Sequence, residues 1–128
     1  MIEPFSTTPV RSEAHHPWRC VDRGLWIRKE GSGLPSAYRE ASLRGALQVQ
    51  STDRLAQALE EIMDEGAEWL VLDMTRVASF DPAAARALAA TASYLENRGG
   101  WLKLRHPRRH IGQALEIVGL GRLVMHDD

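Results

Sequence analysis

The segment FDPAAARAL, residues 80–88, sets an aspartate and a proline directly before an alanine-rich stretch of helical character. The first amides of a helix lack partners within the helix and carry partial positive charge, so such a position suits a phosphoryl group or a carboxylate. Asp81 can cap the helix by accepting a bond from an early amide. Pro82 loses no hydrogen bond at the first helical position. We therefore expect a well-formed helix start at Asp81 and Pro82, where Pro82 has no hydroxyl to phosphorylate.

The remaining reactive side chains do not form a recognisable catalytic or metal site. His106 and His110 are four residues apart, but Pro107 lies between them and spoils a shared helical face. A metal site needs more ligands than these two, so we expect no metal. No nucleophile stands beside a histidine, and the GSG at residues 31–33 precedes no helix. The sequence thus predicts no enzyme and no cofactor.

A single basic cluster, KLRHPRRH, occupies residues 103–110. Such a segment is usually a solvated loop and helix start, and the alternative is docking to an acidic partner surface. The four tryptophans are expected in the core or in strand packing, and an exposed one would mark a contact surface. They are Trp18, Trp26, Trp69 and Trp101.

The strands that must position Asp81 follow from the hydrophobic pattern. WLVLDM, residues 69–74, shows almost no polar alternation, which predicts a central strand buried on both faces. Residues 75–79 are then a short bridge into the next helix. We also expect an edge strand in the second half of residues 18–30, a strand around residues 41–49, and another at residues 101–105. Residues 122–126 are either a short strand or a final turn.

Three helices are predicted at residues 53–65, 82–98 and 108–118. Ser51 or Thr52 can cap the first, and Gly66 ends it. The order strand–strand–helix–strand–helix–strand–helix predicts an α/β fold with helices on at least one face of the sheet.

Composition limits the class of protein. The chain has 128 residues, of which 44% are hydrophobic and 26% charged, with a net charge of −1. This balance predicts one ordinary core and argues against a nucleic-acid or membrane-surface binder. One cysteine excludes an internal disulfide, and no apolar run reaches the roughly 20 residues that a membrane-spanning helix needs. We expect a tail at residues 1–17, a single domain at residues 18–128, and a cytoplasmic location.

Residues 43–124 resemble the STAS domain of bacterial anti-sigma-factor antagonists. Three segments carry the resemblance in order: VLDMTRVASFD at residues 71–81, YLENRGGWLKL at 94–104, and ALEIVGLGRLV at 114–124. The resemblance implies a mixed sheet of four or five strands with helices packed mainly on one face. It also implies a non-enzymatic switch, in which a partner kinase that doubles as an anti-sigma factor phosphorylates a serine at a helix start. The dephosphorylated antagonist then binds that partner and frees the sigma factor.

The sequence departs from the family pattern at the switch itself. Aligned on Asp81, the phosphorylated serine of the family falls on Pro82, and the following glycine falls on Ala84. Two acids of an upstream family motif are replaced by Ala46 and Gln48. Ser79 is a conceivable displaced acceptor, but its place at the strand end favours a partly buried capping or turn residue. The resemblance therefore implies a partner-binding module that is not phosphorylated at the usual site.

By the same resemblance, partner binding is expected at two neighbouring loops at one end of the sheet. The expected contact residues are Asp81, Pro82, Ala83, Arg86, Gln48 and Ser51. The expected partner is an anti-sigma factor or a kinase-like regulator, with no nucleic acid and no membrane insertion; a homodimer is compatible with the sequence. The alternative is an accessory STAS subunit of a larger assembly, such as a lipid-transport ABC ATPase.

Overall fold

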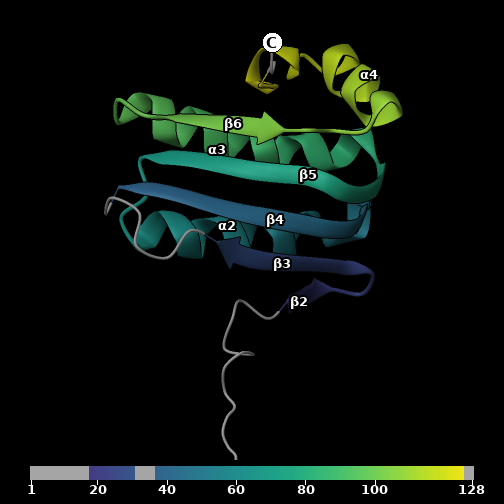
Figure 1. Cartoon of the computed structure of the whole chain (residues 1–128), viewed down its shortest axis with the longest axis horizontal. Helices are drawn as coiled ribbons and strands as arrows, with labels where there is room; N and C mark the ends of the chain where they lie inside the picture. The colour runs from purple at the N-terminus through teal and green to yellow at the C-terminus, as the bar shows by residue number, and fades with distance from the viewer. Residues whose placement is uncertain (1–17, 31–36, 126–128) are drawn as a thin grey trace, which may run out of the picture.

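The structure is a computed structural model, and it describes residues 18–30 and 37–125. Five strands form one sheet in the order β2-β3-β4-β5-β6 (Figure 1). The strands are β2 (Arg19–Asp22), β3 (Leu25–Glu30), β4 (Tyr38–Leu47), β5 (Trp69–Phe80) and β6 (Trp101–Arg105). The α-helices are α2 (Thr52–Asp64), α3 (Ala85–Asn97) and α4 (Arg109–Ile117), and three short 3-10 helices are η2 (Val49–Ser51), η3 (Pro82–Ala84) and η4 (Gly121–Leu123).

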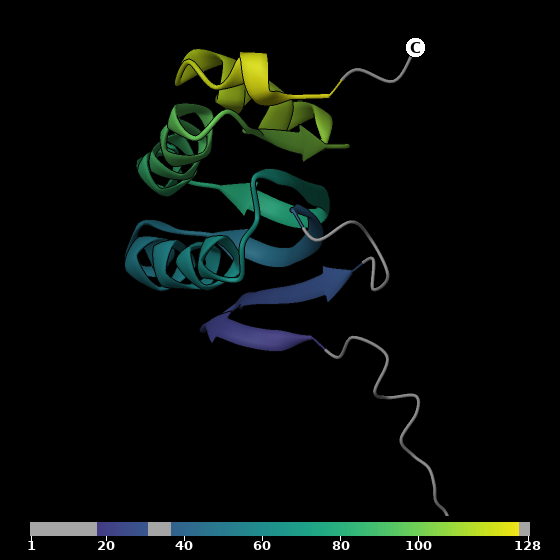
Figure 2. The same cartoon turned by 90° about the vertical axis from the view of Figure 1, so that its left-hand side faces the viewer.

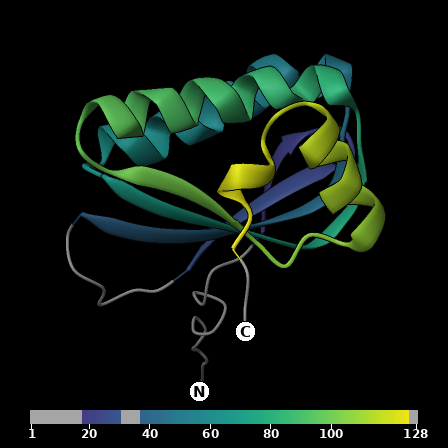
Figure 3. The same ribbon diagram turned by 90° about the horizontal axis from the view of Figure 1, so that it is seen from above.

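The sheet is mixed because its two halves are connected differently. β2, β3 and β4 pair antiparallel, whereas β4, β5 and β6 pair parallel. The parallel pairs need crossover connections, and α2 and α3 supply them. Both helices lie side by side over one face of the sheet (Figures 2 and 3), while α4 and η4 lie at the β6 edge (Figure 1). The α/β class and the mixed sheet covered mainly on one face are confirmed.

The core lies between the sheet and the pair α2 and α3. Leu70, Leu72 and Met74 of β5 have no exposed surface and face these helices. α2 contributes Leu55, Leu59 and Ile62 at helical spacing, and α3 contributes Leu88 and Leu95. Alternate residues of the neighbouring strands complete this layer: Leu25, Ile27, Ala41, Leu43, Leu47, Leu102 and Leu104.

Strand β5 differs from the prediction in two ways. It lies inside the sheet between β4 and β6, but it runs to Phe80, so residues 75–79 are strand rather than a bridge. Its second face is not covered by a helix; Val71 is nevertheless only 1% exposed, whereas Trp69 and Asp73 are half-buried. Pairing with the end of β4 explains the extra length, because Leu47 is the register partner of Phe80.

The N-terminal strands form a hairpin that the sequence did not predict. The second half of residues 18–30 is strand β3 as expected, but β2 takes the edge position. Gly24 adopts a φ of 79° in the turn between them, a conformation that favours glycine. Of the two alternatives for residues 122–126, the described part is a turn: η4 is followed by a single parallel bridge between Leu104 and Val124, and residue 126 lies outside the described residues.

The face of the sheet opposite α2 and α3, here called the uncovered face, carries aromatic and charged side chains. Register and alternation assign to it Trp26, Arg28, Glu30, Tyr38, Glu40, Ser42, Arg44, Trp69, Val71, Asp73, Trp101, Lys103 and Arg105. The ring of Trp18 lies under Arg28 and Arg44, at 4.4 and 4.9 Å. All four tryptophans are half-buried strand-packing residues on this side, and none belongs to the core beneath the helices.

The three carboxylates of the uncovered face pair with arginines, whereas Arg44 and Lys103 lie over tryptophan rings. Arg105 Nε donates to Asp73 Oδ2 at 3.0 Å, and its Nη1 lies 3.5 Å from Glu40 Oε2. Burial alone would raise the pKa of Asp73, but hydrogen bonds from Thr75 and the Arg105 guanidinium outweigh it and lower that pKa. The carboxylates of this face are therefore already neutralised by neighbouring arginines.

Candidate functional site

Two turns meet where β4 and β5 end, at the carboxyl ends of these parallel strands. The Asp81 amide donates to the Leu47 carbonyl at 2.7 Å, which ties the start of η3 to the end of β4. The neighbouring turns η2 and η3 contact each other. We call the predicted contact residues at this place the helix-start surface; they are Gln48, Ser51, Asp81, Pro82, Ala83 and Arg86.

Asp81 and Pro82 form the helix start that the sequence predicts. Asp81 Oδ1 accepts a hydrogen bond from the Ala83 amide at 2.8 Å. Pro82 occupies the first helical position, where its lack of an N–H costs no bond. A short 3-10 turn, Pro82–Ala84, leads into α3. The side-chain cap therefore satisfies the amide that a phosphoryl group at this position would otherwise attract.

Exposure differs among the residues of the helix-start surface. Asp81, Pro82 and Arg86 are exposed, and Gln48 and Ala83 are half-buried. Ser51 is only 1% exposed, so it supplies backbone shape rather than an accessible side chain.

The expectation that Ser51 or Thr52 caps α2 is wrong. Neither side chain makes a cap hydrogen bond, and both hydroxyl oxygens are buried without a partner among the described residues. The intervening turn η2 explains this, because it gives Ser51 helical dihedrals in place of the extended backbone of a capping residue. Gly66 does end the helix, with a φ of 105°.

Ser79 is placed differently from the prediction. It is an exposed residue within β5, paired in register with Ala46, and not a partly buried capping or turn residue. Its hydroxyl is therefore accessible from solvent, two residues before Asp81.

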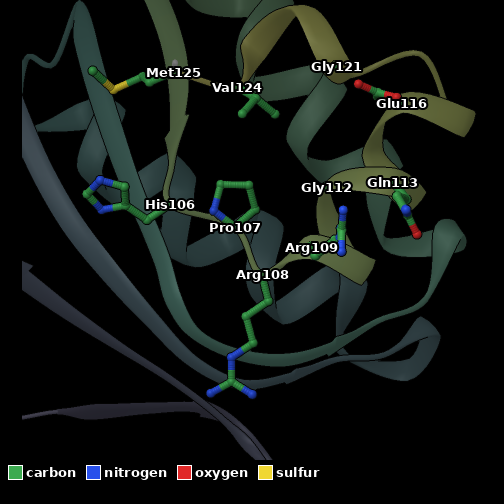
Figure 4. A pocket seen from close by; sticks show the side chains of 10 residues that line it. All are labelled: His106, Pro107, Arg108, Arg109, Gly112, Gln113, Glu116, Gly121, Val124 and Met125. Carbon is green, nitrogen blue, oxygen red and sulfur yellow. The ribbon is translucent and has the colours of Figure 1, made fainter. Parts of the chain in front are cut away.

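The basic segment at residues 103–110 is used in part to anchor α4. Arg108 Nε donates to the Thr75 carbonyl at 3.2 Å, and His110 Nε2 lies 3.1 Å from the Ala78 carbonyl. A pocket of about 480 Å³ opens beside it (Figure 4), where Arg108 extends away from the other lining side chains. Its lining includes His106, Arg109, Gln113 and Glu116. Across residues 18–30 and 37–125, no three His, Cys, Asp or Glu side chains gather as metal ligands would.

Comparison with known proteins decides the family. A family model described as "Mlab, STAS domain" matches residues 38–125. The chain belongs to the STAS domain family. No curated protein sequence matches it. The family match extends from the start of β4 to Met125 and so includes both turns of the helix-start surface.

Solved structures agree with the STAS assignment at the level of the fold. The unphosphorylated anti-sigma factor antagonist SpoIIAA is 16% identical, with a TM-score of 0.66 over 80% of this chain and 88% of the other. The phosphorylated form of SpoIIAA from Bacillus has a TM-score of 0.61 at 16% identity, over 80% and 91%. An anti-sigma factor antagonist from Mycobacterium paratuberculosis is 20% identical, with a TM-score of 0.61 over 77% and 80%.

Two further properties of this STAS domain bear on its surface. None of the described helices has the length and apolar character required to cross a membrane. The structure also contains an apolar groove between α2 and α3, which the sequence did not predict. The groove could not be recognised in the sequence, because alanines such as Ala56 in α2 or Ala87 and Ala90 in α3 also fit a buried helix face.

Proposed function

We propose that this STAS domain is a non-enzymatic protein-binding regulator of the anti-sigma-factor antagonist type that acts without phosphorylation at the usual site. The observation that carries the proposal is the capped helix start at Asp81 and Pro82, where Asp81 Oδ1 bonds the Ala83 amide at 2.8 Å. The Asp81 carboxylate already caps the helix start, and Pro82 offers no hydroxyl to phosphorylate. Regulation then acts through the partner, through abundance, or at another hydroxyl.

Partner binding centres on the helix-start surface. Its two turns are held together by the bond from the Asp81 amide to the Leu47 carbonyl, so they present one continuous shape. Ala83 is small and half-buried, which lets another chain approach closely. With alanine and glutamine at residues 46 and 48, this surface binds mainly by shape and apolar contact, and its affinity depends weakly on salt. The expected partner is an anti-sigma factor or a kinase-like regulator.

The Ala83→Arg variant tests this surface. The first helical turn tolerates arginine, so the fold should persist while a bulky charge enters the contact. We expect binding to the partner, once isolated from the native cell, to be lost in calorimetry while the circular dichroism spectrum is unchanged. Ser93→Arg is the matched control, because Ser93 is exposed farther along α3. Unchanged affinity in a folded Ala83→Arg variant would move the interface elsewhere, first to the basic segment at residues 103–110.

The second candidate is an accessory subunit of a larger assembly, such as a lipid-transport ABC ATPase. Pro82 favours it, because a permanently bound subunit needs no phosphorylation switch at the helix start. Affinity purification with mass spectrometry separates the two candidates. An anti-sigma kinase in the eluate supports the first, and an ABC ATPase supports the second.

A further inference from the structure

The outer side of the helical layer contains an apolar groove. It lies between α2 and α3 and encloses about 280 Å³. Its lining residues are Ala56, Glu60, Met63, Asp64, Ala87, Ala90, Thr91 and Tyr94. Three of the lining residues are alanines, which leave room for a side chain of another molecule, and Tyr94, 41% exposed, also lines the groove. A volume of this size accommodates one or two large aliphatic side chains.

Two carboxylates border the groove on the α2 side. Glu60 and Asp64 are four residues apart, so they project from the same face of the helix on consecutive turns. Neither forms an ion pair with any residue in the described part of the chain. The neighbouring acids differ: Glu61 of α2 pairs with Arg19 at 2.9 Å, and Glu65, directly after α2, pairs with Lys29 at 2.6 Å. The groove thus joins an apolar floor to two uncommitted negative charges.

We infer that this groove binds an amphipathic helix of a protein partner, with an aliphatic side chain in the groove and Lys or Arg residues facing Glu60 and Asp64. The spacing of the two acids favours a helix, because cations at i and i+4 of a partner helix repeat at the same interval along its axis. The small lining residues permit the close approach that helix packing requires. The negative border disfavours an anionic lipid surface.

The inference rests on the proposed function, since it states the chemistry of the partner that the domain binds. Both helices that form the groove begin at the helix-start surface, and Ala56 and Ala87 lie within the first two turns of α2 and α3. A partner that covers Pro82 and Ala83 can therefore continue along the groove. The two contacts differ in net charge: the exposed Asp81 and Arg86 of the helix-start surface have opposite signs, whereas both charges at the groove are negative.

A pair of synthetic peptides tests the groove with the full chain. The first is an amphipathic helix of about 20 residues, long enough to be partly helical in water, with leucines on one face and lysines at i and i+4 along its border. Its twin carries glutamates in place of those lysines. We expect the basic peptide to shift the NMR amide signals of the groove residues. It should bind about tenfold tighter than its twin, because its lysines face the carboxylates of Glu60 and Asp64.

Variants of the groove residues test whether the peptides bind at the groove. The double variant Glu60→Lys with Asp64→Lys should lower the affinity for the basic peptide by about tenfold and raise it for the acidic twin, because both carboxylates at the groove are replaced by positive charges. Asp53→Lys is the control, since Asp53 is an exposed acid of α2 outside the groove. Ala90→Arg should block both peptides by filling the groove. Equal affinity for the twins, shifts on the uncovered face of the sheet, or binding unchanged by these variants would overturn the inference.

The same variants separate the two proposals. If Ala83→Arg leaves peptide binding intact while the groove variants abolish it, the groove is confirmed independently of the helix-start surface. If Ala83→Arg abolishes binding of the isolated partner while the groove variants change neither partner nor peptide affinity, the proposed function stands and the groove inference fails.

Discussion

At the scale of single residues, Asp81 and Pro82 each meet one requirement of a helix start: a partner for an early amide and a helical backbone angle. Asp81 satisfies the amide of Ala83, and Pro82 fixes the backbone angle of the first position without losing a bond. The resemblance to antagonists implies a serine at residue 82. The two residues therefore preserve a capped helix start and offer no hydroxyl at residue 82 for phosphorylation.

Intact-mass measurement after incubation with a cognate kinase and ATP tests this reading of Pro82. We expect no phosphate on residues 81–86, because none of their side chains offers a hydroxyl. Pro82→Ser restores an acceptor and is the matched control; its phosphorylation would show that the kinase recognises the domain. A stoichiometric phosphate on the exposed Ser79 of the natural chain would show instead that the switch has moved by three residues.

Asp73 is the residue whose charge should make stability depend on pH. Its pKa in the folded protein is lowered, since the Thr75 hydrogen bonds and Arg105 outweigh burial. The carboxylate therefore stabilises the fold above its unfolded pKa, and this contribution is lost as pH falls through the lower folded value. We expect Asp73→Asn to cost about 1–2 kcal/mol at pH 7 in urea unfolding. The difference from the natural chain should shrink at about pH 3.

Asp64→Asn serves as the control for Asp73, because Asp64 is exposed and makes no ion pair with a described residue. This variant should leave both the stability at pH 7 and its pH dependence close to those of the natural chain. A loss at Asp73 that stays constant from pH 7 to acid would mean that packing, and not the carboxylate charge, supplies the stabilisation.

At the scale of elements, local patterns predicted what depends on neighbours in sequence. The α/β class, the three helices and the Asp81 cap follow from periodicity and from adjacent residues, and the structure confirms them. The full length of β5 did not follow, since Thr75–Phe80 becomes strand by pairing with the distant end of β4. The burial of Ser51 likewise depends on turn η2, which no local capping rule anticipates.

Features that arise between elements were the least visible in the sequence. The groove exists only because α2 and α3 pack side by side, and its lining alternates between two segments about thirty residues apart. The tryptophans show the same limit. Hydrophobicity predicts that Trp69 and Trp101 are buried, but only the register of β5 and β6 places both on the uncovered face.

Gly45 shows how two strands constrain a single position. A Cβ at Gly45 would collide with the Gly24 carbonyl oxygen, and the φ of Gly45 is 112°. Gly66 has a similar φ of 105° but open space around it. We expect Gly66→Ala to cost about 1–2 kcal/mol from backbone strain alone, and Gly45→Ala to cost at least about 2 kcal/mol more. Equal losses in denaturant unfolding would show that the β2–β3 turn moves away without cost.

At the scale of the whole molecule, the sheet separates two unlike surfaces. The helical layer carries the helix-start surface and the groove, where Glu60 and Asp64 are unpaired among the described residues. The carboxylates of the uncovered face are already paired with arginines, such as Asp73 with Arg105. Because uncommitted groups gain more from a partner than satisfied ones, the helical layer is the side on which regulated binding is expected.

The fold requires the chain from β2 onward. The described core extends from Val21 to Leu123 and joins the hairpin, the parallel strands and the helices in one cluster. We therefore expect residues 18–128 to fold as a single cooperative domain without residues 1–17. A chain that starts at Trp18 should show one calorimetric transition, with a Tm within about 3 °C of the full chain. A starting point at Leu25 is the control: it deletes β2 and the buried Val21, and should lower the Tm clearly. A large Tm loss in the first truncation would place residues 1–17 in the cooperative unit and extend the domain to the start of the chain.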